Sequence, residues 1–560
     1  MKVSDFITAR LVELGIRVVF GVGGANIEDM FAAVQRRRPA IRVALNKHEH
    51  AAGTAADAYA RLTGGLGVVL ATSGGGAMNL VHSVAEARAS SVPLLAIVGE
   101  PPTELQGIGA FQDTSGRRDA IDAAAIFGAA SVWCKRVEHA EQVPRLLSEA
   151  LDATLGPQPG PAVLLVAKDY QSTDLGVEPP FAPYLQPEPI LPDPVKVHCA
   201  ATLLRVGPVL VIAGDEVART GAQQELASLV DALDASVAVA PEARDAFDNF
   251  SPRFAGVCGA MGSPDVARAL EQATTCLVVG TRLPVLARQG LEHLLSDKPL
   301  VSLGHKGPFL TPNQGLHLDA GLRQALRALC ATLDASLAGP RPRPPARVVS
   351  SGVEDGELTS RSALRVIENA LPERSVVIVD AGNTGAAAAH ALRLPHESRW
   401  LLAMGMAGMG YAFGAAIGAA FATGRRCFVL AGDGAFFMNG LDIHTAVEHE
   451  LPITYVIFNN RAHGMCLVRE RLFLAENAGY NSFRRSHLGA GLAAMFPGLV
   501  ACDCRTTAAL AGALTWSARS SGPSLITIEL DHVEIPPFAA FEPLARGITT
   551  ISRGCQDDEH

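Results

Sequence analysis

Short apolar runs that end at glycine or other turn residues recur along the first part of the chain. They are rich in valine, leucine and isoleucine, which is typical of buried strands. Stretches with helical spacing or many alanines separate them. Because strand and helix alternate, the pattern predicts a parallel, doubly wound α/β sheet. The predicted strands lie at 18–25, 43–45, 67–72, 93–99 and 162–167.

The same alternation returns twice further along. Proline-rich stretches at 178–194 and 339–345 separate the three blocks, and such stretches are typical of extended linkers. The chain therefore reads as three α/β domains, each with a doubly wound parallel sheet. We place the domains at 1–175, 195–335 and 358–545. Strands of the second and third blocks are predicted at 209–213, 236–240, 276–280, 300–303, 375–380, 426–431, 453–458 and 524–530.

Composition narrows the function classes. The chain has 560 residues, of which 48% are apolar, and its length suits three domains of ordinary size. A net charge of −9 with no long basic run argues against a nucleic-acid partner. No uninterrupted apolar stretch of about 20 residues predicts a membrane span. The ten cysteines include no CxxC pair, which favours a reducing, cytoplasmic setting.

Two predicted strands of the last domain end in polar residues. The run 426–431 leads into Gly432-Asp433-Gly434, and the run 453–458 leads into Asn459-Asn460. In parallel sheets, ligands bind where the carboxyl ends of the strands meet. A carboxylate and an amide oxygen suit Mg²⁺, which takes phosphate oxygens as further ligands. The flanking glycines would let the backbone approach a diphosphate closely.

Glu49 stands where a short strand becomes a helix of small residues, 51–63. Taken alone, it could be an N-terminal helix residue that the helix dipole favours. The residues around Glu49 form an extended motif, which indicates a functional role as an alternative. Segment 47–64 is followed by Thr72-Ser73-Gly74-Gly75-Gly76-Ala77-Met78-Asn79.

These motifs, in this order, resemble those of thiamine-diphosphate (ThDP) enzymes of the acetolactate synthase branch. Segments 47–64 and 72–79 are similar to the motifs of the pyrimidine-binding domain. Gly432-Asp433-Gly434 and Asn459-Asn460 resemble the metal–diphosphate motif in composition and spacing. The resemblance covers nearly the whole chain and implies three domains, pyrimidine-binding, central and diphosphate-binding. It also implies ThDP and Mg²⁺ as cofactors.

The resemblance assigns roles to individual residues. Glu49 would hydrogen-bond N1′ of the aminopyrimidine, and the carbonyl of Ala407 would accept from its 4′-amino group. Met409 would wedge between the two rings, an irregular gap that methionine fills well. Mg²⁺ would be held by Asp433, Asn460 and the carbonyl of Ala462. The remaining positions implied at the cofactor are Gly24, Gly75, Asn79, Asn383, Gly432, Gly434 and Ala435.

Three residues match substrate-side positions of acetolactate synthases. Phe111-Gln112 matches an active-site Phe-Gln pair, and Lys168 matches a lysine after a strand. An ammonium group and an amide donor near the reacting carbon could hold the carboxylate of a 2-oxo acid. From the residues alone, Lys168 could equally be a surface lysine and Phe111 a core residue.

The implied reaction is carboligation: decarboxylation of a 2-oxo acid such as pyruvate, followed by ligation to a second carbonyl compound. Two alternatives stay open. One is a ThDP-dependent decarboxylase or C–C lyase without ligation, and the other is a non-catalytic regulatory or scaffold paralogue. Glu49 and Asp433 lie in different domains. In this family, the two domains that form one active site come from different subunits. The resemblance therefore implies a homodimer or homotetramer.

The chain departs from the family pattern at several places. Gly23 stands where the family usually has proline. The segment 280–286 lacks the two aspartates and the second arginine that acetolactate synthases carry there, and His305 replaces a frequent acidic FAD contact. These differences weigh against FAD, and the missing arginine weighs against acetohydroxy-acid products. The absence of a consecutive His-His pair argues against the pyruvate decarboxylase branch.

Overall fold

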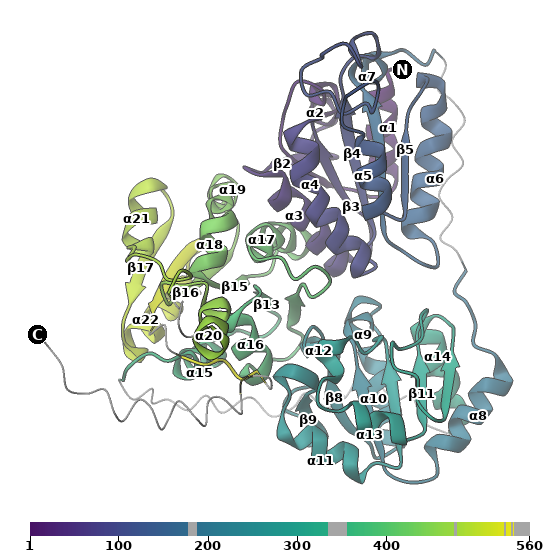
Figure 1. The fold of residues 1–560 in the computed structure, drawn as a ribbon, viewed down its shortest axis with the longest axis vertical. Coiled ribbons are helices and arrows are strands. Elements are labelled where there is room, and N and C mark those ends of the chain that lie inside the picture. The colour runs from purple at the N-terminus through teal and green to yellow at the C-terminus, as the bar shows by residue number, and fades with distance from the viewer. Residues whose placement is uncertain (177–187, 334–355, 475–478, 531–533, 539–540, 542–560) are drawn as a thin grey trace, which may run out of the picture.

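Three six-stranded parallel sheets organise the protein in a computed structural model, which describes residues 1–176, 188–333, 356–474, 479–530, 534–538 and 541 (Figure 1). Helices pack around each sheet. The predicted fold class, three doubly wound parallel-sheet domains, is confirmed. Most of the first predicted linker and all of the second lie outside the described residues.

The N-terminal sheet has the strand order β2-β1-β3-β4-β6-β5. Its strands are β1 (Val18–Gly21), β2 (Arg42–Leu45), β3 (Gly67–Ala71), β4 (Leu94–Glu100), β5 (Trp133–Arg136) and β6 (Pro161–Ala167). The helices of this domain are α1 (Val3–Glu13), α2 (Glu28–Arg36), α3 (Glu49–Thr63), α4 (Gly75–Ala89), α5 (Ala123–Ala130), α6 (Val143–Leu155) and α7 (Lys168–Ser172).

The C-terminal sheet repeats this connectivity in the order β14-β13-β15-β16-β18-β17. Its strands are β13 (Val376–Val379), β14 (Arg399–Leu402), β15 (Cys427–Gly432), β16 (Ile453–Asn459), β17 (Val500–Cys504) and β18 (Ser524–Glu529). The helices are α15 (Ser360–Ala370), α16 (Asn383–Ala391), α17 (Tyr411–Thr423), α18 (Asp433–Asn439), α19 (Ile443–Glu448), α20 (Gly464–Phe473), α21 (Leu488–Met495) and α22 (Thr507–Ser517).

The central sheet is built differently, in the order β12-β11-β10-β7-β8-β9. This order places the first strand of the domain, β7, beside the fourth, β10, as in dinucleotide-binding folds. The strands are β7 (Val209–Ala213), β8 (Ser236–Val239), β9 (Phe254–Val257), β10 (Thr275–Val279), β11 (Leu300–Leu303) and β12 (Gly315–Leu318). The helices are α8 (Pro194–Leu204), α9 (Asp215–Arg219), α10 (Gln223–Ala232), α11 (Pro264–Gln272), α12 (Val285–Arg288), α13 (Glu292–Asp297) and α14 (Leu322–Thr332).

Five strands carry no strong signal in the sequence, and all five are at sheet edges. They are short, and most are only half-buried, so their apolar runs are broken by polar residues. Trp133–Arg136, for example, has no fully buried residue. The five edge strands are β5, β9, β12, β14 and β17.

The N- and C-terminal domains share one hydrophobic core, in which α3 packs against α17 (Figure 1). Small residues make this close contact possible. A Cβ atom on Gly418 would lie 1.9 Å from the carbonyl oxygen of Ala55, and one on Gly414 would lie 2.2 Å from that of Ala51. The two helices lead from the motifs that carry Glu49 and Met409. Their packing therefore fixes both motifs relative to each other.

The length and hydropathy of each helix determine whether it could cross a membrane. Among the residues that the structure describes, none of the helices combines the length and apolar character needed to cross a bilayer.

Candidate active site

The predicted site residues of the N-terminal domain gather at the carboxyl edge of its sheet. Gly24 follows β1, Glu49 follows β2, Gly75 follows β3 and Lys168 follows β6. A Cβ atom on Gly24 would lie 2.6 Å from Cβ of Thr72, so the two glycine turns are in close contact. The sheet thus brings together residues that are up to 144 positions apart in the sequence, the separation of Gly24 and Lys168 (168 − 24).

Glu49 is the first residue of α3 and is nearly buried. Its Oε2 atom accepts a hydrogen bond from Nδ2 of Asn79, at 3.0 Å. Its Oε1 atom lies beside Gly76, where a Cβ atom would be 3.0 Å away. The contact with Asn79 fixes the orientation of the carboxyl group and assigns Oε2 to a partner within the domain.

Three predicted substrate-side residues lie along the same edge. Gln112 has φ of 59° and packs against Gly74, where a Cβ atom would lie 2.7 Å from its own. Phe111 is 76% exposed, so it is not a core residue of this chain. Lys168 donates through Nζ to the carbonyl of Ala25 and pairs with Glu28 at 3.1 Å. Its charge is therefore already partly balanced by a neighbouring carboxylate.

Asp433 lies at the carboxyl edge of the C-terminal sheet, where β15 ends at Gly432 and α18 begins at Asp433 itself. Its side chain is 1% exposed, and neither carboxylate oxygen has a hydrogen-bond partner of good geometry among the described residues. Burial raises the pKa of Asp433 to about 7. The backbone N–H groups of Gly434, Arg461 and Ala462 face the carboxylate and lower its pKa, but burial outweighs them. An unpartnered buried carboxylate is unfavourable unless a cation or donor compensates it.

The neighbours of Asp433 fit a hard cation and a diphosphate. Asn383 begins α16 and has a buried Oδ1 atom without a partner in the described part of the chain. Asn460 follows β16, and its Oδ1 atom accepts from the N–H of Ala462 at 3.2 Å. No three His, Cys, Asp or Glu side chains cluster as metal ligands within the described residues. A single carboxylate with amide and carbonyl oxygens is a donor set that suits Mg²⁺ with phosphate ligands.

The two glycines of this motif have different surroundings, and only Gly432 leaves space for a ligand. The position of a Cβ atom on Gly432 has nothing closer than Thr384, at 3.8 Å. On Gly434, by contrast, a Cβ atom would lie 2.5 Å from Nδ1 of His463. Ala435 is buried in the next turn of α18. Only a glycine therefore fits at position 434, where the backbone passes beside the His463 ring.

The loop 405–409 follows β14 and leads into α17. Ala407 adopts φ of 53°, a left-handed conformation that costs a non-glycine residue roughly 1 kcal/mol. Met409 is half-buried against the core shared by the two domains. Asp380 holds the end of the loop, because Oδ1 accepts from the N–H of Gly410 and Oδ2 from that of Ala412, both at 2.9 Å. Burial raises the pKa of Asp380 to about 6.

Asp442 is a residue of the site that the sequence does not reveal. It follows α18, and its carboxylate accepts from the side chain of Asn46 and from the backbone N–H groups of Lys47 and His48. These residues directly precede Glu49. Nothing in the local sequence marks the contact, because the two partners are 396 positions apart.

Several histidines also surround the site. The rings of His50 and His82 stack at 4.6 Å, and the ring of His82 lies against Gly408. Burial, followed by the neighbouring His82, lowers the pKa of His50 to about 3, so His50 is neutral. His463 meets Phe483 edge-to-face at 4.7 Å. These contacts join sequence-distant elements and were not predictable from spacing.

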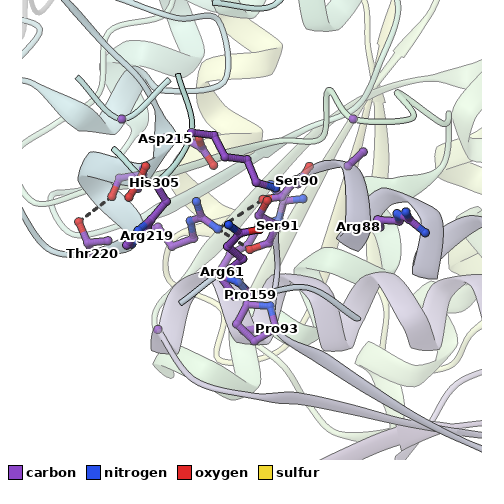
Figure 2. A pocket seen from close by; sticks show the side chains of 18 of the residues that line it. Arg61, Arg88, Ser90, Ser91, Pro93, Pro159, Asp215, Arg219, Thr220 and His305 are labelled. Atoms are coloured by element: carbon purple, nitrogen blue, oxygen red, sulfur yellow. Dashed lines mark hydrogen bonds between the residues drawn. The ribbon is translucent and has the colours of Figure 1, made fainter. Parts of the chain in front are cut away.

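A cavity of about 1780 Å³ lies where the three domains meet, away from Glu49 and Asp433. Figure 2 shows Arg219 reaching toward Ser90 and Ser91, whose carbonyls it contacts at 3.3 and 2.6 Å. Asp215 and Glu216 follow β7, at the position where dinucleotide folds bind phosphates. Two carboxylates there disfavour a diphosphate, although Arg219 and Arg282 also line the cavity. The expectation against FAD stays a prediction.

Family models match all three domains. The N-terminal TPP binding domain of thiamine pyrophosphate enzymes matches residues 1–122, the central domain matches 198–333, and the C-terminal TPP binding domain matches 380–528. Thiamine pyrophosphate is another name for ThDP. The matched segments include Glu49, the loop 405–409 and the Asp433 motif.

Curated relatives match over most of their length. The large subunit of acetolactate synthase isozyme 1 from Escherichia coli is 26% identical, with 96% of each chain covered. That of isozyme 2 is 25% identical, over 96% of this chain and 98% of the relative. A solved structure described as a candidate thiamin diphosphate-dependent enzyme from Mycobacterium smegmatis superposes with a TM-score of 0.79. It covers 95% of this chain and 99% of its own, at 21% identity, and supports the fold alone.

Proposed function

The chain belongs to the thiamine pyrophosphate enzymes, in the branch similar to acetolactate synthase, and on that premise we propose that it is a Mg²⁺-dependent carboligase. It decarboxylates a 2-oxo acid, with pyruvate as the first candidate, and ligates the remaining carbon unit to a second carbonyl compound. The observation that carries the proposal is Asp433, a buried carboxylate with neither oxygen partnered in the described residues. It lies at the carboxyl end of β15, the edge of a parallel sheet where ligands bind, which supports a metal–diphosphate site there.

Bound ThDP would supply a carbon nucleophile that adds to a carbonyl group and takes up the electron pair left by carbon dioxide. The chain's own residues hold and orient it. Asp433, Asn460 and the carbonyl of Ala462 would hold Mg²⁺, and Asn383 would contact the diphosphate. Ala407 would offer its carbonyl oxygen, and Met409 would support the bend between the rings.

Glu49 would handle the proton in this site. Asn79 occupies its Oε2 atom, so Oε1 is the atom that would hold and release a proton. The fixed orientation keeps this atom in one place through the reaction. Glu49 and Asn79 therefore act together.

The substrate carboxylate would bind to residues of the N-terminal domain, at the carboxyl edge of its sheet. Lys168 already pairs with Glu28, which leaves it a weaker partner for an incoming anion. Gln112 packs on Gly74, at the turn that begins α4, and α4 is the helix that carries Asn79. We therefore assign the first contact with the carboxylate to the amide of Gln112, with Phe111 shaping the rim.

A second copy of the chain completes the proposal. Exposed large apolar side chains flank both halves of the site, and such patches are typical of surfaces that a partner covers. We propose a homodimer or tetramer in which Glu49 of one subunit faces the Asp433 motif of another. In the N-terminal and C-terminal domains these exposed side chains are Leu105, Ile108, Phe111, Ile121, Met406, Phe437, Met438 and Leu441.

A screen of 2-oxo acid donors with aldehyde and 2-oxo acid acceptors tests the function. Each pair is incubated with the protein, ThDP and Mg²⁺, and products are identified by mass spectrometry. Ligation products that are lost in Glu49→Gln support the proposal. Aldehyde without ligation would instead identify a decarboxylase or lyase, and no turnover with any donor would identify a non-catalytic paralogue.

A further inference from the structure

Helix α4 contacts both Glu49 and the loop 405–409 within one chain. Asn79, His82 and Glu86 follow one another at spacings of three and four residues, so they lie on one face of the helix. Asn79 donates to Glu49, and the ring of His82 lies against Gly408. Glu86 reaches the start of the loop. None of the motifs identified in the sequence includes Glu86.

The carboxylate of Glu86 is held by four donors. Its Oε1 atom accepts from the N–H of Gly405 at 3.2 Å, from Oγ of Ser90 at 2.8 Å and from Arg61 at 3.3 Å. Its Oε2 atom accepts from the N–H of Met406. Two of the four donors are thus backbone N–H groups of the C-terminal domain. They belong to Gly405 and Met406, the two residues that precede Ala407.

Charge balance explains why these backbone contacts matter. Arg61 pairs first with Asp57, at 2.6 Å, and Asp57 also accepts from the hydroxyl of Tyr411. Two buried carboxylates therefore share one guanidinium, and the N–H groups of the loop stabilise the remaining negative charge. Burial would by itself raise the pKa of Glu86, but Arg61 and the backbone donors hold it below the ordinary range. Glu86 is therefore ionised at neutral pH.

We propose that Glu86 is a positioning residue: from the N-terminal domain it fixes the loop 405–409 through the N–H groups of Gly405 and Met406. The proposal rests on the assignment of Ala407 and Met409 to the ThDP site. With Glu86 in place, Ala407 is held at its left-handed φ and its carbonyl is presented in one orientation. An amide at position 86 would turn an NH₂ group toward one of the two N–H donors, and the loop would shift.

Glu86→Gln tests the proposal, with Glu100→Gln as the matched control. Glu100 is a second buried carboxylate of the same domain, paired with Arg136 at 2.9 Å. Amide hydrogen exchange of the loop is measured in the protein without cofactor, and the ThDP dissociation constant is measured by calorimetry with Mg²⁺. We expect at least about tenfold faster exchange at 405–406 and about tenfold weaker ThDP binding in Glu86→Gln. Glu100→Gln should lower the melting temperature and leave both quantities unchanged.

Wild-type exchange at 405–406, or wild-type ThDP affinity, in Glu86→Gln would overturn the proposal. So would equal changes in the Glu100→Gln control. If Glu86→Gln does not fold, Ser90→Ala decides the question, because it removes one donor to Oε1 and should speed exchange at 405–406 less strongly. Unchanged exchange in Ser90→Ala would then contradict the proposal. Amide hydrogen exchange and ThDP affinity are measured without substrates. The result can therefore be interpreted even if the carboligase assignment is wrong.

Discussion

Asp442 accepts a hydrogen bond from Nδ2 of Asn46 at 2.9 Å, across the boundary between the C- and N-terminal domains. Both residues are buried, and each lies in a segment that also carries a predicted site residue. Asn46 precedes Glu49 by three positions, and Asp442 follows the α18 helix that starts at Asp433. The contact thus ties the segment that leads to Glu49 to the segment after the Asp433 motif of the same chain.

Replacing Asp442 by asparagine should disturb this junction. The new NH₂ group would face the N–H groups of Lys47 and His48, which now donate to the carboxylate at 3.2 Å. We expect a loss of about 1–3 kcal/mol in the free energy of unfolding and weaker ThDP binding. Urea unfolding measures the first effect. Asp265→Asn, at an exposed ion pair, should change stability by no more than about 0.5 kcal/mol.

Asp433→Asn should separate metal binding from folding. The substitution removes an unpartnered buried carboxylate, so the protein without cofactors should become more stable at pH 8, by on the order of 2–4 kcal/mol. The same variant should lose the ability of Mg²⁺ to tighten ThDP binding. Denaturant unfolding with and without Mg²⁺, together with calorimetry, checks both effects. A variant less stable than the parent at pH 8 would contradict the assignment.

Asp380 should make stability depend on pH in the absence of cofactor. Burial raises its pKa from 3.8 to about 6, so the folded state retains a proton that the unfolded state releases. Its contribution is therefore fully present below about pH 4 and is lost as pH rises through 6, by on the order of 3 kcal/mol. Comparing wild type with Asp380→Asn at pH 4 and pH 7 isolates this contribution. If the free energy of unfolding changed equally with pH in the two proteins, Asp380 would not be the source of the pH dependence.

Mixing two inactive variants tests whether the site is shared between subunits. Glu49→Gln and Asp433→Asn each remove one half of the site. In a dimer with sites between subunits, random exchange of chains gives mixed dimers with one intact and one doubly altered site. Equal mixing should therefore restore about a quarter of the wild-type activity. No recovery, with exchange of subunits verified by mass spectrometry, would place both halves within one chain.

The site residues that were predictable from the sequence share one property. Asp433, Asn460 and Glu49 lie within four residues after apolar runs, and the carboxyl ends of parallel strands are where ligands bind. The loop around Ala407 was predictable only through its resemblance to a family motif. Its left-handed conformation at an alanine could not be foreseen, because alanine gives no local signal for positive φ.

Glu86 and Asp442 escaped prediction for a different reason. Both are ordinary acidic residues on helices or helix ends, where sequence patterns usually indicate a solvated surface. Their partners lie about 320 and 396 positions away in another domain. The packing of α3 against α17 holds the two domains together, and both carboxylates are buried in the folded chain.

The central claim is that the protein ligates two carbonyl compounds after decarboxylation. The most direct test incubates it with pyruvate labelled with ¹³C at the carbonyl carbon, in the presence of ThDP and Mg²⁺, and follows the products by ¹³C NMR. We expect a product with two adjacent labelled carbons, formed with release of carbon dioxide and absent with Glu49→Gln. Labelled acetaldehyde as the sole product, or unchanged pyruvate, would contradict ligation of pyruvate.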